Sequence, residues 1–125
     1  MVNKKDNKLV LVVDDKQYIL NIVKRILEYE GYKVITSKTG SNALELIKTE
    51  NPDLIITDIN IGEMNGLDLC REIRDNILYK HTQIIVLSGE RPIDIQKQIE
   101  LKISKWITKP FEYKEFVDII NSLLH

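Results

Sequence analysis

The sequence contains a single cysteine, Cys70, so no disulfide can form within the chain. This usage is typical of proteins from a reducing compartment. Cys70 lies in a helical pattern with no histidine near it in sequence, and we interpret it as a small core residue rather than a nucleophile. The chain also has no apolar run long enough to span a bilayer and no signal-peptide pattern, so we expect a cytoplasmic location and no membrane partner.

The chain has almost no net charge, because 18 Lys and Arg face 19 Asp and Glu. This balance favours neither direct binding to nucleic acid nor binding to an anionic membrane. We interpret the Lys4–Lys5 pair near the start as a solvated end. No repeat, low-complexity tract or linker is visible, and 125 residues suffice for one hydrophobic core. We therefore expect one domain over residues 1–125, with its core over about 8–124.

Three continuous apolar runs indicate buried strands of a parallel sheet, at Leu9–Val13, Leu54–Ile56 and Gln83–Leu87. Shorter stretches at 32–36 and 106–108 predict two more strands. Apolar residues at helical spacing follow each of the five strands. Strict alternation of strand and helix predicts a single doubly wound (βα)5 domain of the α/β class, with a flavodoxin-like sheet covered on both faces. The distribution of polar groups, described below, favours the strand order 2-1-3-4-5.

Several helix ends can be predicted from capping and turn residues. The first helical pattern begins at Lys16, where Asp15 can cap it, and Gly31 is expected to stop it. Pro92 suits the first turn of the fourth helix, which is expected to run to about Leu101. The segment 59–66 is expected to be a loop, with its two glycines as flexible points.

Polar side chains follow the carboxyl ends of four predicted strands. They are Asp14, Asp15, Asp58, Ser88 and Lys109. Parallel strands all point the same way, so their carboxyl ends share one edge of the sheet, where ligands of open α/β sheets bind. A lone Asp58 could simply cap a turn after its strand. Independent caps, however, do not explain a serine after the fourth strand together with a lysine after the fifth.

The chemistry of these side chains points to phosphoryl transfer with a divalent cation. Neighbouring carboxylates repel one another, and a cation relieves that repulsion. Hard oxygen ligands without histidine or cysteine favour Mg²⁺ over zinc or copper. Lys109 and the Ser88 hydroxyl can bind phosphoryl oxygens, and an aspartate can act as the nucleophile. Asp58, at the end of the central strand, is the best candidate for that nucleophile.

Four short pieces in this order carry a family resemblance. They are Val12-Val13-Asp14-Asp15, Ile56-Thr57-Asp58, Leu87-Ser88-Gly89 and Lys109-Pro110-Phe111. From Leu9 to about Leu124, the chain resembles a receiver domain of bacterial two-component response regulators, of the chemotaxis-regulator type.

The resemblance implies that Asp58 accepts a phosphoryl group from a phosphohistidine on a partner histidine kinase or phosphotransfer protein. It implies that Asp15, with Asp14 through water, holds Mg²⁺ alongside Asp58, and that the backbone carbonyl of Asn60 completes the protein ligands. The phosphorylation chemistry would be the domain's own, so we expect a signalling domain rather than an enzyme.

The resemblance also implies that Lys109 and Ser88 bind the phosphoryl oxygens and that the Lys109–Pro110 peptide is cis. Trp106 stands at the place of the switch aromatic, which turns inward when Ser88 moves toward the phosphoryl group. Because Trp is larger than the usual Tyr or Phe and its N–H needs a partner when buried, we expect the inward rotamer to be harder to reach.

The output surface implied by the resemblance comprises the fourth helix, the fifth strand and the fifth helix. It would bind a downstream protein or output domain, with the chain as a monomer or a phosphorylation-dependent dimer. Asn60 and Glu90 stand at the positions that gate the hydrolytic water in similar domains. Because both are polar and Gly89 is small, we expect a short-lived phosphoryl group.

Three alternatives share parts of this pattern. The first is a receiver-fold interaction module that works without phosphorylation. The second is a Mg²⁺-dependent aspartyl-phosphate phosphohydrolase, which needs a second Asp where this chain has Asn60. The third is a flavodoxin-like FMN protein, which needs a Ser/Thr/Gly-rich phosphate loop after the first strand instead of Asp14-Asp15-Lys16-Gln17.

Two departures from the family pattern bear on local structure. Gly62 replaces the usual Pro, so we expect a more mobile loop after Asp58. Lys102-Ile103 replaces the usual Gly-Ala, so the end of the fourth helix is expected to shift by a residue or two.

Overall fold

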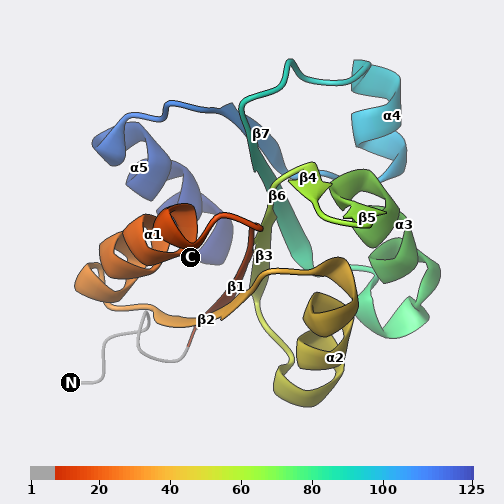
Figure 1. The fold of residues 1–125 in the computed structure, drawn as a ribbon, viewed down its shortest axis with the longest axis horizontal. Coiled ribbons are helices and arrows are strands. Elements are labelled where there is room, and N and C mark those ends of the chain that lie inside the picture. Colours follow the sequence, from red (N-terminus) through yellow and green to blue (C-terminus); the bar gives the residue numbers. More distant parts are fainter. Residues whose placement is uncertain (1–7) are drawn as a thin grey trace.

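A five-stranded parallel sheet runs through the centre of the molecule, with helices on both of its faces (Figure 1). The computed structural model describes residues 8–125, so the Lys4–Lys5 pair and the first seven residues of the predicted domain lie outside the described part. The strands are β1 (Leu9–Val13), β2 (Lys33–Ser37), β3 (Leu54–Thr57), β6 (Gln83–Ser88) and β7 (Lys105–Thr108). Their order in the sheet is β2-β1-β3-β6-β7, which confirms the predicted order 2-1-3-4-5.

The helices divide between the two faces of the sheet. Helices α1 (Gln17–Tyr29) and α5 (Tyr113–Leu124) cover one face (Figure 1). Helices α2 (Gly40–Glu50), α3 (Gly66–Asp75) and α4 (Ile95–Glu100) lie on the other, and a 3₁₀ turn, η2 (Ile77–Tyr79), follows α3. This arrangement is the predicted doubly wound fold.

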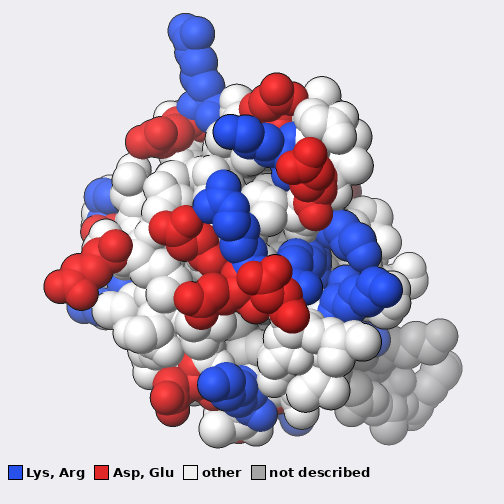
Figure 2. Space-filling model, turned by 90° about the vertical axis from the view of Figure 1, so that its right-hand side faces the viewer, with Lys and Arg blue, Asp and Glu red and all other residues white. Residues whose placement is uncertain are grey.

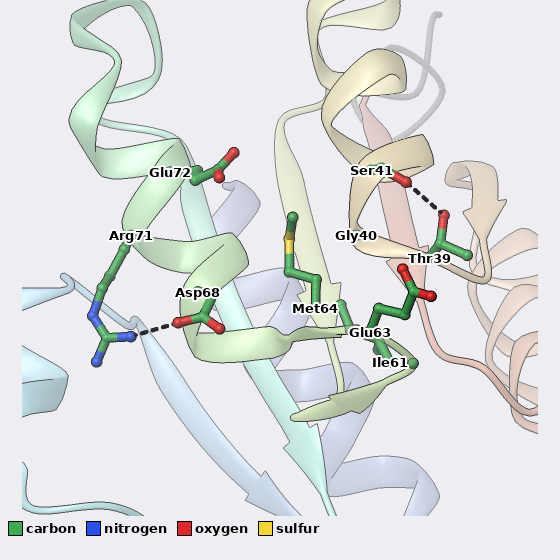
Figure 3. A pocket seen from close by; sticks show the side chains of 10 residues that line it. Thr39, Gly40, Ser41, Ile61, Glu63, Met64, Asp68, Arg71 and Glu72 are labelled. Atoms are coloured by element: carbon green, nitrogen blue, oxygen red, sulfur yellow. Dashed lines mark hydrogen bonds and ion pairs between the residues drawn. The ribbon is translucent and has the colours of Figure 1, made fainter.

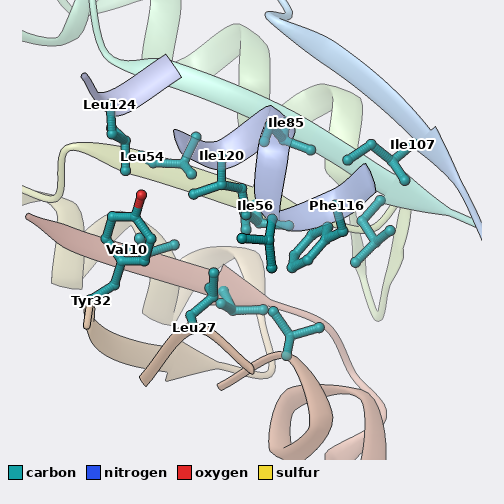
Figure 4. Close-up of a cluster of buried hydrophobic side chains, with 14 of the residues drawn as sticks. Val10, Leu27, Tyr32, Leu54, Ile56, Ile85, Ile107, Phe116, Ile120 and Leu124 are labelled. Carbon is teal, nitrogen blue, oxygen red and sulfur yellow. The ribbon is translucent and has the colours of Figure 1, made fainter. Parts of the chain in front are cut away.

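Two hydrophobic clusters fill the space between sheet and helices. Alternate residues of β1 serve them in turn, because successive strand side chains point to opposite faces: Val10 packs in the cluster under α1 and α5, and Leu11 in the cluster under α2 and α3. Figure 4 shows the first of these clusters, in which Phe116 and Ile120 of α5 lie over the strands. Cys70 packs in the second cluster, and burial raises the pKa of its thiol to about 12. Its interpretation as a core residue is confirmed.

The start of α1 differs from the prediction. Its N-cap is Lys16, which makes no side-chain cap bond, and the backbone N–H of Lys16 donates to Asp14 Oδ1 at 2.9 Å. The prediction that Asp15 caps the helix is therefore wrong, because the inward-facing neighbour Asp14 takes the bond. Gly31 ends the helix as predicted, with a φ of 98° that suits glycine.

Helix α4 is shorter than predicted at its amino end. It begins at Ile95 rather than at Pro92, because Asp94 is the N-cap and accepts a hydrogen bond from the Gln96 N–H at 2.7 Å. At the other end, Ile103 N–H donates to the Gln98 carbonyl at 3.0 Å in a Schellman arrangement. That arrangement places Lys102 at φ 52°, in the left-handed region where glycine is normally found.

We predict that Lys102→Gly stabilises the protein. The left-handed backbone costs a residue with a Cβ about 1–2 kcal/mol, part of which is offset by the greater freedom of glycine in the unfolded chain. The expected net gain in unfolding free energy is about 1 kcal/mol, measured by urea denaturation. Lys97→Gly, inside the same helix, is the control and should destabilise by about 1 kcal/mol. A Lys102→Gly protein no more stable than the wild type would contradict the assignment of strain to this residue.

The segment after β3 is a short antiparallel hairpin rather than an irregular loop. Strands β4 (Asn60–Ile61) and β5 (Met64–Asn65) pair across a turn in which Gly62 has φ 86°. Gly66 is not a flexible point, contrary to the prediction. A Cβ on Gly66 would lie 2.0 Å from the backbone oxygen of Asp58, so glycine is needed there for close packing of two backbones.

Candidate functional site

Two carboxylates and one ammonium group meet at the carboxyl edge of the sheet. Lys109 Nζ lies 2.9 Å from Asp14 Oδ2 and 2.9 Å from Asp58 Oδ2. Both aspartates are buried, at 2% and 4% relative exposure, and Ser88 beside them is fully buried. The structure thus brings together four of the five polar residues that follow the strand ends.

Hydrogen bonds to the neighbouring strands fix the backbone positions of these residues. Asp14, Asp58 and Lys109 each follow a strand, and their backbone N–H groups continue the ladder to the neighbouring strand. Asp58 N–H donates to the Val13 carbonyl at 3.0 Å, and Lys109 N–H donates to the Ser88 carbonyl at 2.8 Å. Asp14 and Asp58 are adjacent because β1 pairs with β3, at the point where the strand order reverses. The Lys109–Pro110 peptide is cis, as the resemblance implied.

Asp58 is held as an ionised carboxylate. Burial alone would raise its pKa, but hydrogen bonds from Lys109 and from the Ser88 side chain lower it below the ordinary value. The backbone of the hairpin adds to this effect, because Ile59 N–H donates to Asp58 Oδ1 at 2.6 Å. An ionised, oriented carboxylate is the form that can act as a nucleophile.

The pKa values of Asp14 and Lys109 are also shifted in this cluster. Burial raises the pKa of Asp14, and this outweighs the lowering caused by the Lys16 N–H and Lys109. Burial would lower the pKa of Lys109, but its hydrogen bonds to Asp14 and Asp58 raise it. Lys109 is therefore a firmly protonated ammonium that neutralises charge at the edge of the sheet.

Glu90 connects the site to Trp106 and to the hairpin. These contacts were not predicted from the sequence. Its N–H donates to Ser88 Oγ at 3.1 Å, and its carbonyl accepts from the Trp106 indole N–H at 3.4 Å. Its carboxylate accepts from Asn60 Nδ2 at 3.0 Å. Trp106 is partly exposed in this arrangement. No sequence signal distinguishes these contacts, because two of the three involve the backbone of Glu90.

Asp15 is placed apart from the buried carboxylates. Its side chain is 43% exposed and lies 3.6 Å from Lys16 Nζ. Within residues 8–125, no three His, Cys, Asp or Glu side chains are grouped closely enough to hold a metal ion. The donor set nevertheless fits Mg²⁺, because the available ligands are all oxygens and Mg²⁺ keeps most of its waters, needing only one or two carboxylates.

A groove of about 850 Å³ lies beside the hairpin, between α2 and α3 (Figure 3). Met64 of β5 projects into it and packs on Gly40, where a Cβ would lie 2.4 Å from the Met64 sulfur. Asp68 and Arg71 form an ion pair on its α3 side. None of Asp14, Asp58, Ser88 and Lys109 lines this groove, so it is separate from the buried cluster.

Figure 2 shows acidic and basic side chains interspersed over the face that it presents. No helix within the described part of the chain is long and apolar enough to cross a membrane.

Comparison with known proteins identifies the family. The family model of the response regulator receiver domain matches residues 10–121. The alkaline phosphatase synthesis transcriptional regulatory protein PhoP of Bacillus subtilis is 33% identical over 118 residues, which are 94% of this chain and 49% of PhoP. The chain therefore spans about half the length of this curated relative.

Solved structures give the same answer. The chemotaxis protein CheY4 of Vibrio cholerae matches with a TM-score of 0.86 and 29% identity, over 93% of this chain and 98% of CheY4. The non-phosphorylated HemR receiver domain of Leptospira biflexa matches with a TM-score of 0.84 and 27% identity, over 94% of both chains. The chain therefore belongs to the response regulator receiver domain family of two-component signalling.

Proposed function

We propose that Asp58 accepts a phosphoryl group from a histidine kinase or phosphotransfer protein, with Mg²⁺, and that this changes the surface of α4, β7 and α5 for a downstream partner or output domain. The observation that carries the proposal is the buried Asp14–Lys109–Asp58 cluster, with 2.9 Å contacts on both sides of the ammonium group. We propose that the protein acts in the cytoplasm as a signalling domain.

In the proposed reaction, a carboxylate oxygen of Asp58 attacks phosphorus and the P–N bond to the donor imidazole breaks. The product is an acyl phosphate on Asp58, and the electron pair leaves with the imidazole. Lys109 moves its hydrogen bond from the Asp58 carboxylate to a phosphoryl oxygen, and the Ser88 hydroxyl donates to another. Asp15, Asp58 and the Asn60 carbonyl, with Asp14 through water, would hold Mg²⁺, which would supply charge neutralisation.

Helix α1 offers a surface on which the protein that donates the phosphoryl group could dock. Three large side chains lie exposed along one stripe of this helix: Tyr18 at 61%, Ile22 at 48% and Tyr29 at 82%. Exposed apolar stripes of this kind are common at protein–protein contacts. Because α1 begins beside Asp14, a protein docked on it would have its reactive group near the carboxyl edge of the sheet.

The output side of the proposal is supported by α4. Ile95 and Ile99 are exposed at 68% and 62%. Glu90, which precedes α4, donates its backbone N–H to Ser88 Oγ, so a movement of Ser88 toward a phosphoryl group would disturb that contact. A downstream partner would then contact the exposed isoleucines, whose position depends on the state of the site.

The proposal is tested by incubating the protein with acetyl phosphate and Mg²⁺ and measuring its intact mass. We expect one phosphoryl group on the wild type, none on Asp58→Asn, and none on the wild type when EDTA removes the metal. Equal incorporation by the wild type and Asp58→Asn would contradict the role of Asp58. No incorporation by either protein would favour an interaction module that works without phosphorylation.

We predict a short phosphoryl lifetime that depends on Asn60 and Glu90. Their hydrogen bond at 3.0 Å places two polar side chains at the edge of the site, where they can hold the hydrolytic water. The double variant Asn60→Met, Glu90→Leu should lose phosphate about tenfold more slowly, because this water loses its polar partners. Release of inorganic phosphate measures the rate. Slower loss from the wild type than from the variant would refute the prediction.

We also predict little change at Trp106 on activation. The indole N–H already has the Glu90 carbonyl as a partner, and a buried indole would need a new one. Beryllofluoride with Mg²⁺, which mimics the phosphoryl group, should therefore alter tryptophan fluorescence only slightly. A large quench with a blue shift would count against this prediction and would indicate an inward ring.

A further inference from the structure

One arginine ties together the ends of two helical segments. Arg74, in the last turn of α3, donates from Nε to the Leu101 carbonyl at 2.8 Å and from Nη2 to the Lys102 carbonyl at 2.9 Å. Its Nη1 donates to the carbonyls of Tyr79 at 2.9 Å and Lys80 at 3.4 Å. The first two carbonyls close α4 and the other two close η2.

A cation stabilises carbonyls in this position more than it stabilises other backbone carbonyls. The last carbonyls of a helical segment have no partner within it and carry its negative partial charge. The planar guanidinium satisfies two such ends at once, because its donors point in fixed, divergent directions. A lysine ammonium at the same place could not span both pairs of carbonyls.

The amino end of α4 is held differently. None of the residues of α4 is buried, whereas Leu101 just after it packs in the core at 9% exposure. Before the helix, Glu90 makes contacts of 3.1 Å to Ser88 and 3.4 Å to Trp106. The first of these contacts is made to Ser88, which is itself part of the buried phosphoacceptor cluster. The two ends of α4 are thus tied to different parts of the molecule.

We propose that Arg74 is a positioning residue that fixes the carboxyl end of α4 as a pivot. When Ser88 changes partner, the Glu90 N–H loses its contact with Ser88 Oγ and the amino end of α4 moves, while the end at Leu101 and Lys102 stays in place. Arg74 thereby turns a local change at the site into a rotation of Ile95 and Ile99. This inference rests on the proposed phosphoacceptor function. Figure 1 shows α4 next to α3 on the same face, as the pivot requires.

Amide hydrogen exchange followed by NMR tests the pivot first without any ligand. The reporters are the N–H groups of Leu101, Lys102 and Ile103, which close α4. In Arg74→Met their protection should fall about tenfold, because the carbonyls at this end lose their charged partner. The matched control is Arg71→Met, one turn earlier on α3, where the guanidinium pairs, within residues 8–125, with the exposed Asp68 alone. Its reporters should stay within about twofold of the wild type.

The second arm adds beryllofluoride and Mg²⁺. In the wild type, exchange of the Glu90 and Gln96 amides should change about tenfold while the reporters at Leu101 to Ile103 change less than about twofold. In Arg74→Met both ends should change. Arg74→Lys keeps a cation near the helix ends and replaces Arg74→Met in these experiments if Arg74→Met does not fold. Its amides should show the same changes that we predict for Arg74→Met, because one ammonium group cannot span both pairs of carbonyls.

The outcomes separate the pivot from the phosphoacceptor function. Unchanged protection in Arg74→Met, or equal changes at both ends of wild-type α4, would overturn the pivot alone. Absence of a bound fluoride signal in ¹⁹F NMR of the wild type would overturn the phosphoacceptor function and the pivot together. Loss of protection at Leu101 to Ile103 in Arg71→Met as large as in Arg74→Met would also overturn the pivot, because the effect would then not depend on the four carbonyls.

Discussion

Gly66→Ala is expected to lower the free energy of unfolding by about 3 kcal/mol and to slow phosphoryl uptake. A Cβ at this position would lie 2.0 Å from the Asp58 carbonyl oxygen and 2.9 Å from the Ile59 Cα. Both are backbone atoms, so no side-chain rotation relieves the clash. The start of α3 must then move away, which breaks the 2.7 Å hydrogen bond from Gly66 N–H to the Ile59 carbonyl. Asp58 loses its fixed position as a result.

Urea denaturation and the rate of phosphorylation by acetyl phosphate measure these two effects. Gly89→Ala is the matched control, because it also adds one methyl group beside a strand end of the site but meets no atom within 4 Å. It should stay within about 0.5 kcal/mol of the wild type. A Gly66→Ala protein as stable and as reactive as Gly89→Ala would contradict the close approach of the two backbones.

Lys109→Met is expected to destabilise the protein by about 3 kcal/mol at neutral pH and to abolish phosphoryl transfer. The change leaves the carboxylates of Asp14 and Asp58 buried without the ammonium group that lies 2.9 Å from each. Both carboxyl pKa values should then rise, because burial and mutual repulsion remain while the attraction is gone. Lys105→Met, an exposed lysine on β7, is the control and should cost less than about 0.5 kcal/mol.

The loss of stability in Lys109→Met should depend on pH. In the wild type the folded-state pKa of Asp58 is lowered, so its contribution to stability is present at neutral pH and is lost as pH falls below about 4. The pKa of Lys109 is raised, so its contribution is present at neutral pH and is lost above about pH 10. The deficit of Lys109→Met should therefore shrink as pH falls toward 4, where the buried carboxyls of the variant are protonated. A deficit that stays constant from pH 8 to pH 4 would contradict this electrostatic account.

Much of the fold could be predicted because its signals are local. The apolar runs 9–13, 54–56 and 83–87 have to be buried on both faces, and a parallel sheet between two helical layers does this for strands so short. The order of the strands followed from where the polar residues stand. The start of α4 was missed because Pro92 and Asp94 both favour a helix start, and the side-chain cap made by Asp94 decides between them.

The parts of the site that could not be predicted depend on contacts across the chain. The need for glycine at position 66 arises from the Asp58 backbone, which only the packed α3 brings within reach. Which of Asp14 and Asp15 faces inward depends on the pleat of β1 and on Lys109, 95 residues away from Asp14. Arg74 donates to backbone carbonyls, and every residue has a backbone carbonyl, so the sequence does not show which ones are its partners.

The most direct test of the central claim is to locate the phosphoryl group. The protein is phosphorylated with acetyl phosphate and Mg²⁺ and then reduced with borohydride, which converts an aspartyl phosphate to homoserine. Peptide mass spectrometry identifies the position that has changed. The account predicts homoserine at position 58 and nowhere else. Homoserine at position 14 or 15 with Asp58 unchanged would contradict it.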